Sequence, residues 1–392
     1  MRNEDDPDRG TPSVPLLTIC RDWLRLGCIG FGGPPTHIAL LRKLCTEQND
    51  WIEATEFEDA IATTNLLPGP ASTQLAIYSA WRLAGPVGGI LGGVCFIVPG
   101  LILILCLSVL FLLHHPPDWV LGAAAGAGAA IPGVALNAAR GLTPASWERA
   151  GDGALQRARW ISFALVGAAV AATAGSFLVI ALVVCGVVEV LVGRDRSSQR
   201  GLASVAPVFT VTTAAIGGAG ALAWVAFKVG ALSYGGGFVI VPLMQHDAVA
   251  TYHWMTGSQF LTAVALGQIT PGPVVQTVAV VGYAAGGIYG GLLAALIAFS
   301  PSFVFVLAGG RHFAGIRRSK NAGLFLKGAG PAVIGAIAGS AVPLGLELPH
   351  LWQIPVVGGS LIWFFALTRG VVSALLLCGV VGVLLALSGV PV

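Results

Sequence analysis

Long apolar runs alternate with short polar stretches along most of the chain. A helix that crosses a bilayer needs about 20 apolar residues in succession. The apolar runs are 60–80, 86–113, 119–139, 160–192, 204–233, 258–284, 286–308, 328–346, 353–368 and 370–391. The run 160–192 is too long for one simple span, so we expect a turn near Gly175 and Ser176 to divide it into two short helices. This pattern predicts an all-α polytopic membrane protein.

The first apolar run, 14–30, is interrupted by charge at Arg21, Asp22 and Arg25. It is either a helix at the membrane interface or a helix that faces the protein interior. The preceding residues 1–10 are polar and acidic. We therefore expect no cleavable signal peptide, and insertion would depend on the internal helices.

Composition supports a surface that faces lipid. Hydrophobic residues make up 55% of the 392 residues and charged residues only 10%, against about 25% charged residues in soluble proteins. Many of the 54 glycines lie inside the apolar runs, where small residues let helices approach closely. The lipid bilayer is therefore the first predicted partner.

The same composition excludes several classes of function. The net charge of +3 is small and no basic stripe carries interleaved aromatic residues, so we expect no nucleic-acid partner. The seven cysteines form no CxxC pair and are typical of buried thiols. The sequence has no zinc, nucleotide or nucleophile motif, so we expect no metal, no cofactor and no enzymatic activity.

An internal repeat appears at an offset of 203 residues. It places Trp51 on Trp254, and Pro68-Gly69-Pro70 on Pro271-Gly272-Pro273. Further matched pairs are Gly27 with Gly230, Gly32-Gly33 with Gly235-Gly236, Leu40 with Leu243, Phe57 with Phe260, Ala60 with Ala263, Ala62 with Ala265, Ala76 with Ala279, Gly88 with Gly291 and Phe96 with Phe299. Composition bias would not match two tryptophans and two Pro-Gly-Pro triplets in one register. We predict two homologous halves, 1–200 and 201–392.

Matched loops of the two halves carry opposite charge signals. The segment 34–59 is densely charged, while its counterpart 237–262 has no Lys or Arg. The segment 114–118 has no Lys or Arg, while its counterpart 311–320 is strongly basic. Because Lys and Arg mark cytoplasmic loops, the halves are expected to be inverted relative to each other.

Three basic clusters, within 140–159, 194–200 and 311–320, are all predicted to be cytoplasmic. They fall on one side only if the Pro-Gly-Pro segments re-enter the membrane and return to their starting side. The side of the N-terminus stays open, because strict inversion places it outside and an interfacial first helix places it inside.

The two Pro-Gly-Pro triplets are the main candidates for a binding region: Pro68, Gly69 and Pro70, and Pro271, Gly272 and Pro273. Proline removes a backbone donor and glycine adds freedom, so each triplet should break its helix. A simple kink is the alternative. Half-helices that start after the triplets would point free N–H groups at the midplane from opposite sides, which suits an anion.

Polar side chains beside the triplets repeat as well. Asn65 aligns with Gln268, and Thr73-Gln74 with Gln276-Thr277. Buried amides and hydroxyls are costly unless they find partners, so they either bind a ligand or hydrogen-bond between helices.

A cation and a glycine-rich turn also recur in both halves. Arg25 aligns with Lys228, and each could neutralise a dianion or snorkel to the interface. The turns Phe31-Gly32-Gly33 and Tyr234-Gly235-Gly236 follow them, and their backbone N–H groups could form anion-binding nests.

Candidate proton carriers are Glu56, Asp59 and His37. They belong to the charged segment of the first half. The alternative interpretation is that these side chains only solvate a cytoplasmic loop. Glu189 lies near a helix end and is expected to reach the interface.

The repeated elements resemble the chromate ion transporter family, in its long two-domain type. The matching residues are Phe31-Gly32-Gly33-Pro34, Pro68-Gly69-Pro70, Tyr234-Gly235-Gly236-Gly237 and Pro271-Gly272-Pro273. The resemblance covers nearly the whole chain, and Tyr234 is a mild departure from the aromatic Phe. It implies a bacterial inner-membrane protein that exports chromate, driven by the proton-motive force.

The residues leave rival functions open. A permease for sulfate or another oxyanion is one, because sulfate has the same charge and nearly the same shape as chromate. A passive anion channel is the second, and a membrane enzyme is the third. A homodimer is one assembly that we consider.

Overall fold

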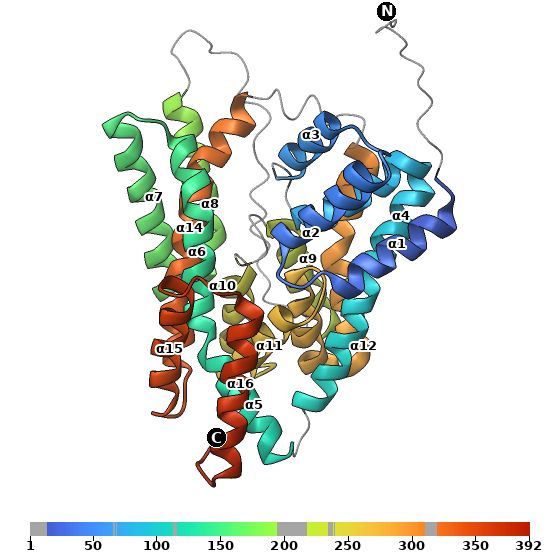
Figure 1. Cartoon of the computed structure of the whole chain (residues 1–392). Helices are drawn as coiled ribbons and strands as arrows, with labels where there is room; N and C mark the ends of the chain where they lie inside the picture. Colours follow the sequence, from blue (N-terminus) through green and yellow to red (C-terminus); the bar gives the residue numbers. More distant parts are fainter. Residues whose placement is uncertain are drawn as a thin grey trace, which may run out of the picture.

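The computed structural model describes residues 14–65, 67, 69–112, 116–193, 218–233, 238, 240–309 and 320–392, and within these ranges it contains helices and no strands (Figure 1). The predicted all-helical class is confirmed. Tyr234, Gly235, Gly236 and Pro68 lie outside the described residues, as do the basic residues within 194–200 and 311–319.

The first part of each half has the same order of elements. In the first half these are α1 (Leu16–Ile29), α2 (Pro34–Arg42), the π-helix η1 (Lys43–Gln48), α3 (Ala54–Thr64) and α4 (Ala71–Phe111). In the second half they are α9 (Ala219–Leu232), α10 (Ile240–Gln245), the π-helix η3 (His246–Thr251), α11 (Gly257–Ile269), the short η4 (Val274–Gln276) and α12 (Thr277–Gly309).

The offset of 203 residues extends to backbone detail. Asp50 and His253 are both left-handed, with φ of 51° and 53°. The Trp51 N–H donates to the Cys45 carbonyl at 2.8 Å, and the Trp254 N–H donates to the Ala248 carbonyl at the same distance. Since left-handed non-glycine residues are uncommon, this match reflects a shared local fold.

Beyond the triplets the structural offset becomes 202 residues. α4 bends at Ala84 and Gly85, and α12 bends at Gly286 and Gly287 with nearly the same dihedral angles. The ungapped alignment is therefore wrong in this region, because one residue is absent between the second triplet and its helix. Gln74 now matches Gln276, and Gly100 matches Ser302.

Glycines let the helices of each half pack closely. A β-carbon at Gly27 would lie 2.6 Å from the Phe96 carbonyl oxygen, and one at Gly230 would collide with the Ala298 carbonyl. These contacts join α1 to α4 and α9 to α12. The long helices α4 and α12 also pack against each other.

The remaining helices interlock the two halves. They are α5 (Asp118–Ala129), α6 (Ile131–Ala150), α7 (Ala154–Thr173), η2 (Gly175–Phe177), α8 (Leu178–Gly193), α14 (Lys320–Leu346), α15 (Gln353–Phe365) and α16 (Val371–Leu387). α14 of the second half packs against α7 and α8 of the first, while α5 packs against α16. The predicted turn near Gly175 is confirmed by the short η2 between α7 and α8.

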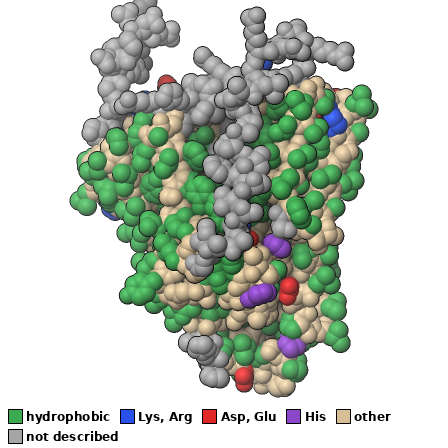
Figure 2. Space-filling model, turned by 180° about the vertical axis from the view of Figure 1, so that it is seen from behind, with side chains coloured by type: hydrophobic (Ala, Val, Ile, Leu, Met, Phe, Trp, Pro, Cys, Tyr) green, Lys and Arg blue, Asp and Glu red, His purple; other side chains and the backbone are tan. Residues whose placement is uncertain are grey.

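Within the described part of the chain, four helices are long and apolar enough to cross a bilayer: Ala71–Phe111, Asp118–Ala150, Val274–Gly309 and Gly323–Leu346. Several apolar helices are shorter than a full span. Fewer of the ten apolar runs therefore form full-length spanning helices than the sequence pattern predicts. Apolar side chains cover much of the surface seen in Figure 2, and many large ones, such as Leu296 and Leu384, are exposed. Such a surface suits lipid, and we treat the chain as a multi-pass membrane protein.

The interlock gives a direct stability prediction. A β-carbon at Gly167 of α7 would collide with the Ala332 carbonyl of α14, whereas Gly358 of α15 has open space around it. Gly167→Leu should therefore destabilise the protein by about 1–3 kcal/mol or more, as overpacking does. Thermal unfolding in detergent should show a clear loss for Gly167→Leu and little change for the control Gly358→Leu. Equal unfolding temperatures would contradict the close packing of α7 on α14.

Candidate functional site

The second triplet lies against the glycine-rich turn of the first half. The Gly272 N–H donates to the Gly30 carbonyl at 2.9 Å. A β-carbon at Gly33 would lie 3.9 Å from the Val274 side chain, next to the triplet. Gly32 and Gly33 have φ of 98° and 76°, which glycine adopts without strain. The turn that follows α1 therefore contacts the start of the α12 segment across the two halves.

The first triplet likewise contacts the second half. Gly69 has φ of 118°, and a β-carbon there would lie 3.5 Å from the Gly230 carbonyl and 3.2 Å from the Ser302 hydroxyl. Gly230 belongs to α9 and Ser302 to α12. The described residues of both triplets thus contact the opposite half. α4 begins directly after Pro70.

The two matched glutamines are buried beside the triplets. Gln276 is fully buried, and its Nε2 donates to the Ile97 carbonyl of α4 at 2.8 Å. Its Oε1 has no hydrogen-bond partner among the described residues. Gly100 makes room for this contact, because a β-carbon there would collide with the Pro271 carbonyl and with Gln276. Gln74 is also fully buried, and its Nε2 lies beside Gly69.

Several neighbouring polar groups are buried without a partner within the described part of the chain. They are the hydroxyls of Thr73 and Ser302 and the Nε2 of Gln268. Thr277 differs, because its hydroxyl donates to the Val274 carbonyl at 2.8 Å. A buried donor left unpaired costs about 1–3 kcal/mol, so these groups suit a site that a polar ligand completes.

Ser302 is a residue that the sequence reasoning missed. It occupies the position that Gly100 holds in the first half and adds a hydroxyl beside the first triplet. A serine next to Pro301 inside an otherwise apolar run was the available signal.

The expected pair of free cations is not what the structure has. Lys228 forms an ion pair with Asp247 at 2.5 Å, and its ammonium lies 5.8 Å from the centre of the Trp224 ring. Arg25 is exposed on α1. Because Asp247 already neutralises Lys228, a joint role of the two cations in charge neutralisation does not fit this arrangement. Phe31 is also largely exposed.

The three candidate proton carriers occupy different environments. Glu56 accepts a hydrogen bond from the Arg82 Nε at 2.5 Å. Asp59 is exposed on α3. His37, which was expected in a solvated loop, is only 1% exposed. That solvated interpretation is wrong for His37, because α2 folds back against α4.

His37 connects the turn of the first half to the start of α4. Its Nε2 lies 2.8 Å from the Gly30 carbonyl and its Nδ1 lies 3.2 Å from the Ser72 hydroxyl. Since a carbonyl can only accept, Nε2 carries the proton and Nδ1 of the neutral ring accepts from Ser72. The Gly30 carbonyl therefore accepts two hydrogen bonds, one from the His37 Nε2–H and one from the Gly272 N–H. The ring also meets Phe96 edge-on at 5.1 Å.

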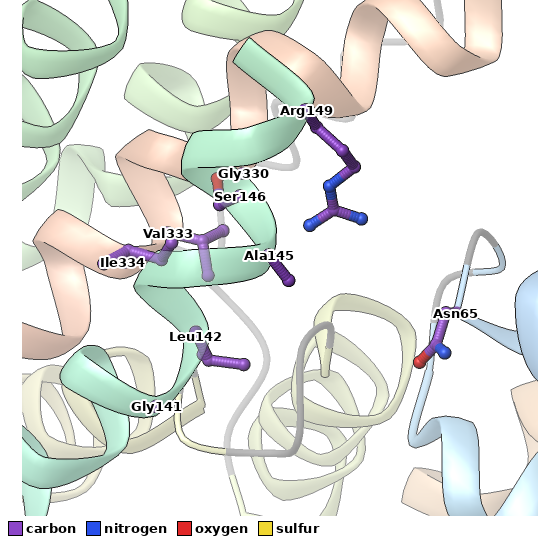
Figure 3. A pocket seen from close by; sticks show the side chains of 9 residues that line it. All are labelled: Asn65, Gly141, Leu142, Ala145, Ser146, Arg149, Gly330, Val333 and Ile334. Carbon is purple, nitrogen blue, oxygen red and sulfur yellow. The ribbon is translucent and has the colours of Figure 1, made fainter. Parts of the chain in front are cut away.

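A cavity of about 210 Å³ lies between α6, α14 and the end of α3 (Figure 3). Its lining residues are Asn65, Gly141, Leu142, Ala145, Ser146, Arg149, Gly330, Val333 and Ile334. Asn65 and Arg149 lie on opposite sides of this space in Figure 3. Of the predicted site residues, Asn65 is the one that lines the cavity.

Glu189 was expected to reach the interface, and that expectation is wrong. It is 4% exposed on α8, and its carboxylate lies 3.5 Å from the Arg159 guanidinium of α7. The packing of α14 over α8 covers it, since Gly328 lies directly against its β-carbon.

Comparison with known proteins finds chromate transport proteins that are similar to this chain. The chain is 32% identical to a chromate transport protein of Cupriavidus metallidurans, over 85% of this chain and 83% of that protein. It is 29% identical to a probable chromate transport protein of Synechococcus elongatus, over 89% of this chain and 90% of that protein. A chromate transport protein of Pseudomonas aeruginosa is 28% identical over 85% of this chain and 82% of that protein. No solved structure matches the chain.

The family model described as "Chromate transporter" matches residues 17–190 and 220–384. These stretches contain both described triplet regions, the turn after α1 and the interlocked helices. The chain belongs to the chromate transporter family, whose members are transport proteins rather than enzymes.

Proposed function

We propose that this transporter exports chromate from the bacterial cytoplasm across the inner membrane, driven by the proton-motive force. The dianion would bind where each triplet meets the opposite half. The observation that carries this proposal is the pair of cross-half contacts, Gly272 with Gly30 and Gly69 with Gly230. Family membership supports chromate as the transported anion.

The proposed site binds the anion with neutral donors. The helix that begins after Pro70 offers backbone N–H groups that have no partner within the helix. The hydroxyls of Thr73 and Ser302 and the amide of Gln268 are buried donors near the triplets. A tetrahedral oxyanion presents four acceptor oxygens, so it can satisfy several of these donors at once. Gln276, Gly69 and Gly272 would hold the backbone of the site in place.

We further propose that the halves are inverted repeats that move relative to each other. The directions of two helices support this idea. α6 and α7 form a hairpin, so they run in opposite directions, and α14 packs alongside α7 and descends with it in Figure 1. α6 and α14 therefore run in opposite directions. Rocking of one half against the other would open the site to alternate sides, as in other inverted-repeat carriers.

His37 is the proposed proton-coupling residue. Burial lowers the pKa of the His37 imidazole below its ordinary value, and the hydrogen bond to the Gly30 carbonyl partly opposes this shift. Its described contacts are Gly30, Ser72 and Phe96. The second half has Ile240 at the matched position. Protonation would require Nδ1 to donate, so Ser72 would have to turn its hydroxyl away.

Two rival functions predict different fluxes in everted membrane vesicles. A proton-coupled chromate carrier should lose chromate uptake when a protonophore collapses the gradient. A passive channel should keep its flux under the same treatment. A sulfate permease should show chromate uptake that excess sulfate abolishes, whereas a chromate carrier should be only weakly inhibited by sulfate.

The binding proposal predicts a difference between two nearby serines. Ser302→Ala removes a buried donor beside the first triplet, which should reduce chromate uptake about tenfold, the effect of losing roughly 1.4 kcal/mol. Ser300→Ala is the control, because Ser300 is exposed and its hydroxyl donates to the Ile297 carbonyl of its own helix. Initial rates in vesicles with matched protein levels test this. If the Ser302→Ala variant takes up chromate at the wild-type rate, the anion does not bind beside the first triplet.

The buried His37 also predicts a pH dependence of stability. Because its folded pKa is lowered, the unfolded chain binds more protons, so stability falls as pH drops below the ordinary histidine pKa. His37→Asn should reduce this loss, measured as unfolding temperature in detergent at pH 8 and pH 5. The exposed His253 serves as the control through His253→Asn. An unchanged pH dependence in His37→Asn would exclude a neutral buried imidazole.

A further inference from the structure

The cavity between α6, α14 and the end of α3 contains a charge that the described part of the protein leaves available. Arg149 is the charged residue in its lining. It has no hydrogen-bond or ion-pair partner within the described ranges of the chain. Arg157, by contrast, is paired with Asp152 at 2.8 Å, and Arg140 donates to the Phe364 carbonyl at 3.3 Å. Arg149 therefore differs from these two arginines in having no polar partner among the described residues.

The position of Arg149 follows from the periodicity of α6. Gly141, Leu142, Ala145, Ser146 and Arg149 share one face of the helix, with spacings of three and four residues. That face forms one wall of the cavity. In Figure 3 the Arg149 guanidinium extends from this wall into the open space.

Asn65 forms the opposite wall of the cavity. Asn65 ends α3 and lies four residues before Gly69. Its side-chain amide is exposed and has no partner among the residues that the structure describes. An anion in the cavity can thus meet a guanidinium on one side and an amide donor on the other, next to the segment that carries the triplet.

A third polar group completes the lining. The Ser146 hydroxyl accepts a hydrogen bond from the Trp160 indole at 3.0 Å. Its own proton is therefore free to point toward a ligand. The volume of about 210 Å³ greatly exceeds the roughly 30 Å³ that one liquid water occupies, so the cavity has room for an oxyanion with part of its hydration shell.

We propose that this cavity is an anion vestibule, in which Arg149 attracts a doubly charged tetrahedral oxyanion and Asn65 passes it to the first triplet. The inference rests on the proposed function and adds a second anion site to it. Arg149 belongs to the basic cluster within 140–159 that marks the cytoplasmic side, so the vestibule would load the transporter from the cytoplasm. A guanidinium in a cleft raises the local anion concentration and the rate of capture.

The test is the concentration dependence of chromate uptake by purified full-length protein in phosphatidylcholine liposomes, with the cytoplasmic face outward. Arg149→Gln should raise the KM for chromate about tenfold with little change in the maximal rate, since it removes recruitment rather than transport. Arg149→Lys should retain most of the wild-type KM. The KM of wild type should rise with ionic strength more steeply than that of Arg149→Gln.

Arg157→Gln is the matched control, because Arg157 is a surface arginine of the same cluster that is already paired. An unchanged KM in Arg149→Gln, or an equal effect of Arg157→Gln, would overturn the vestibule. The phosphate of a lipid headgroup offers the same chemistry as the oxyanion. If Arg149→Gln impairs uptake only when phosphatidylglycerol is present, then Arg149 binds lipid and the vestibule is excluded.

Failure of the proposed function would look different from failure of the vestibule. Wild-type protein that takes up no chromate under any gradient would refute the transport proposal itself. Equilibrium binding of labelled chromate to wild type and Arg149→Gln in detergent would then still decide the vestibule. Tighter binding by wild type supports it, and equal binding contradicts it.

Discussion

Backbone polar groups that leave a helix inside a membrane must find partners within the protein, because lipid offers none. The described residues of both triplets lie against the opposite half. The Gly272 N–H donates to the Gly30 carbonyl, and Gly69 lies close to Gly230. The hydrogen bond of Gly272 gives a backbone donor of the second half an acceptor in the first half. Contact between the halves therefore supports the local structure of the second triplet.

Close approach of helices makes this pairing geometrically available. Gly27 and Gly230 bring α1 and α9 against the long helices of their own halves, and Gly100 lets Gln276 reach the Ile97 carbonyl across the halves. α14 of the second half packs on α7 and α8 of the first half, and α5 of the first half packs on α16 of the second. These contacts hold the two halves together. In the proposed mechanism, one half would rock against the other while this packing keeps the two halves attached.

Much of this architecture could be predicted from the sequence. The offset of 203 residues between Trp51 and Trp254 anticipated matching elements as far as the triplets. The one-residue shift beyond them could not be seen, because glycine and alanine match in either register. The environments of His37 and Lys228 were also missed. Local charge density suggests a solvated loop, yet burial of His37 and the pairing of Lys228 with Asp247 depend on contacts formed only in the fold.

In the proposed function, chromate binds where each triplet meets the opposite half. The most direct measurement is an experimental structure of the chromate-bound protein, with chromium located by its anomalous scattering. We expect a chromium position whose oxygens lie within hydrogen-bonding reach of Ser302 and of the start of α4 after Pro70. A chromium position remote from both triplets, with the triplet regions unchanged and dry, would contradict it.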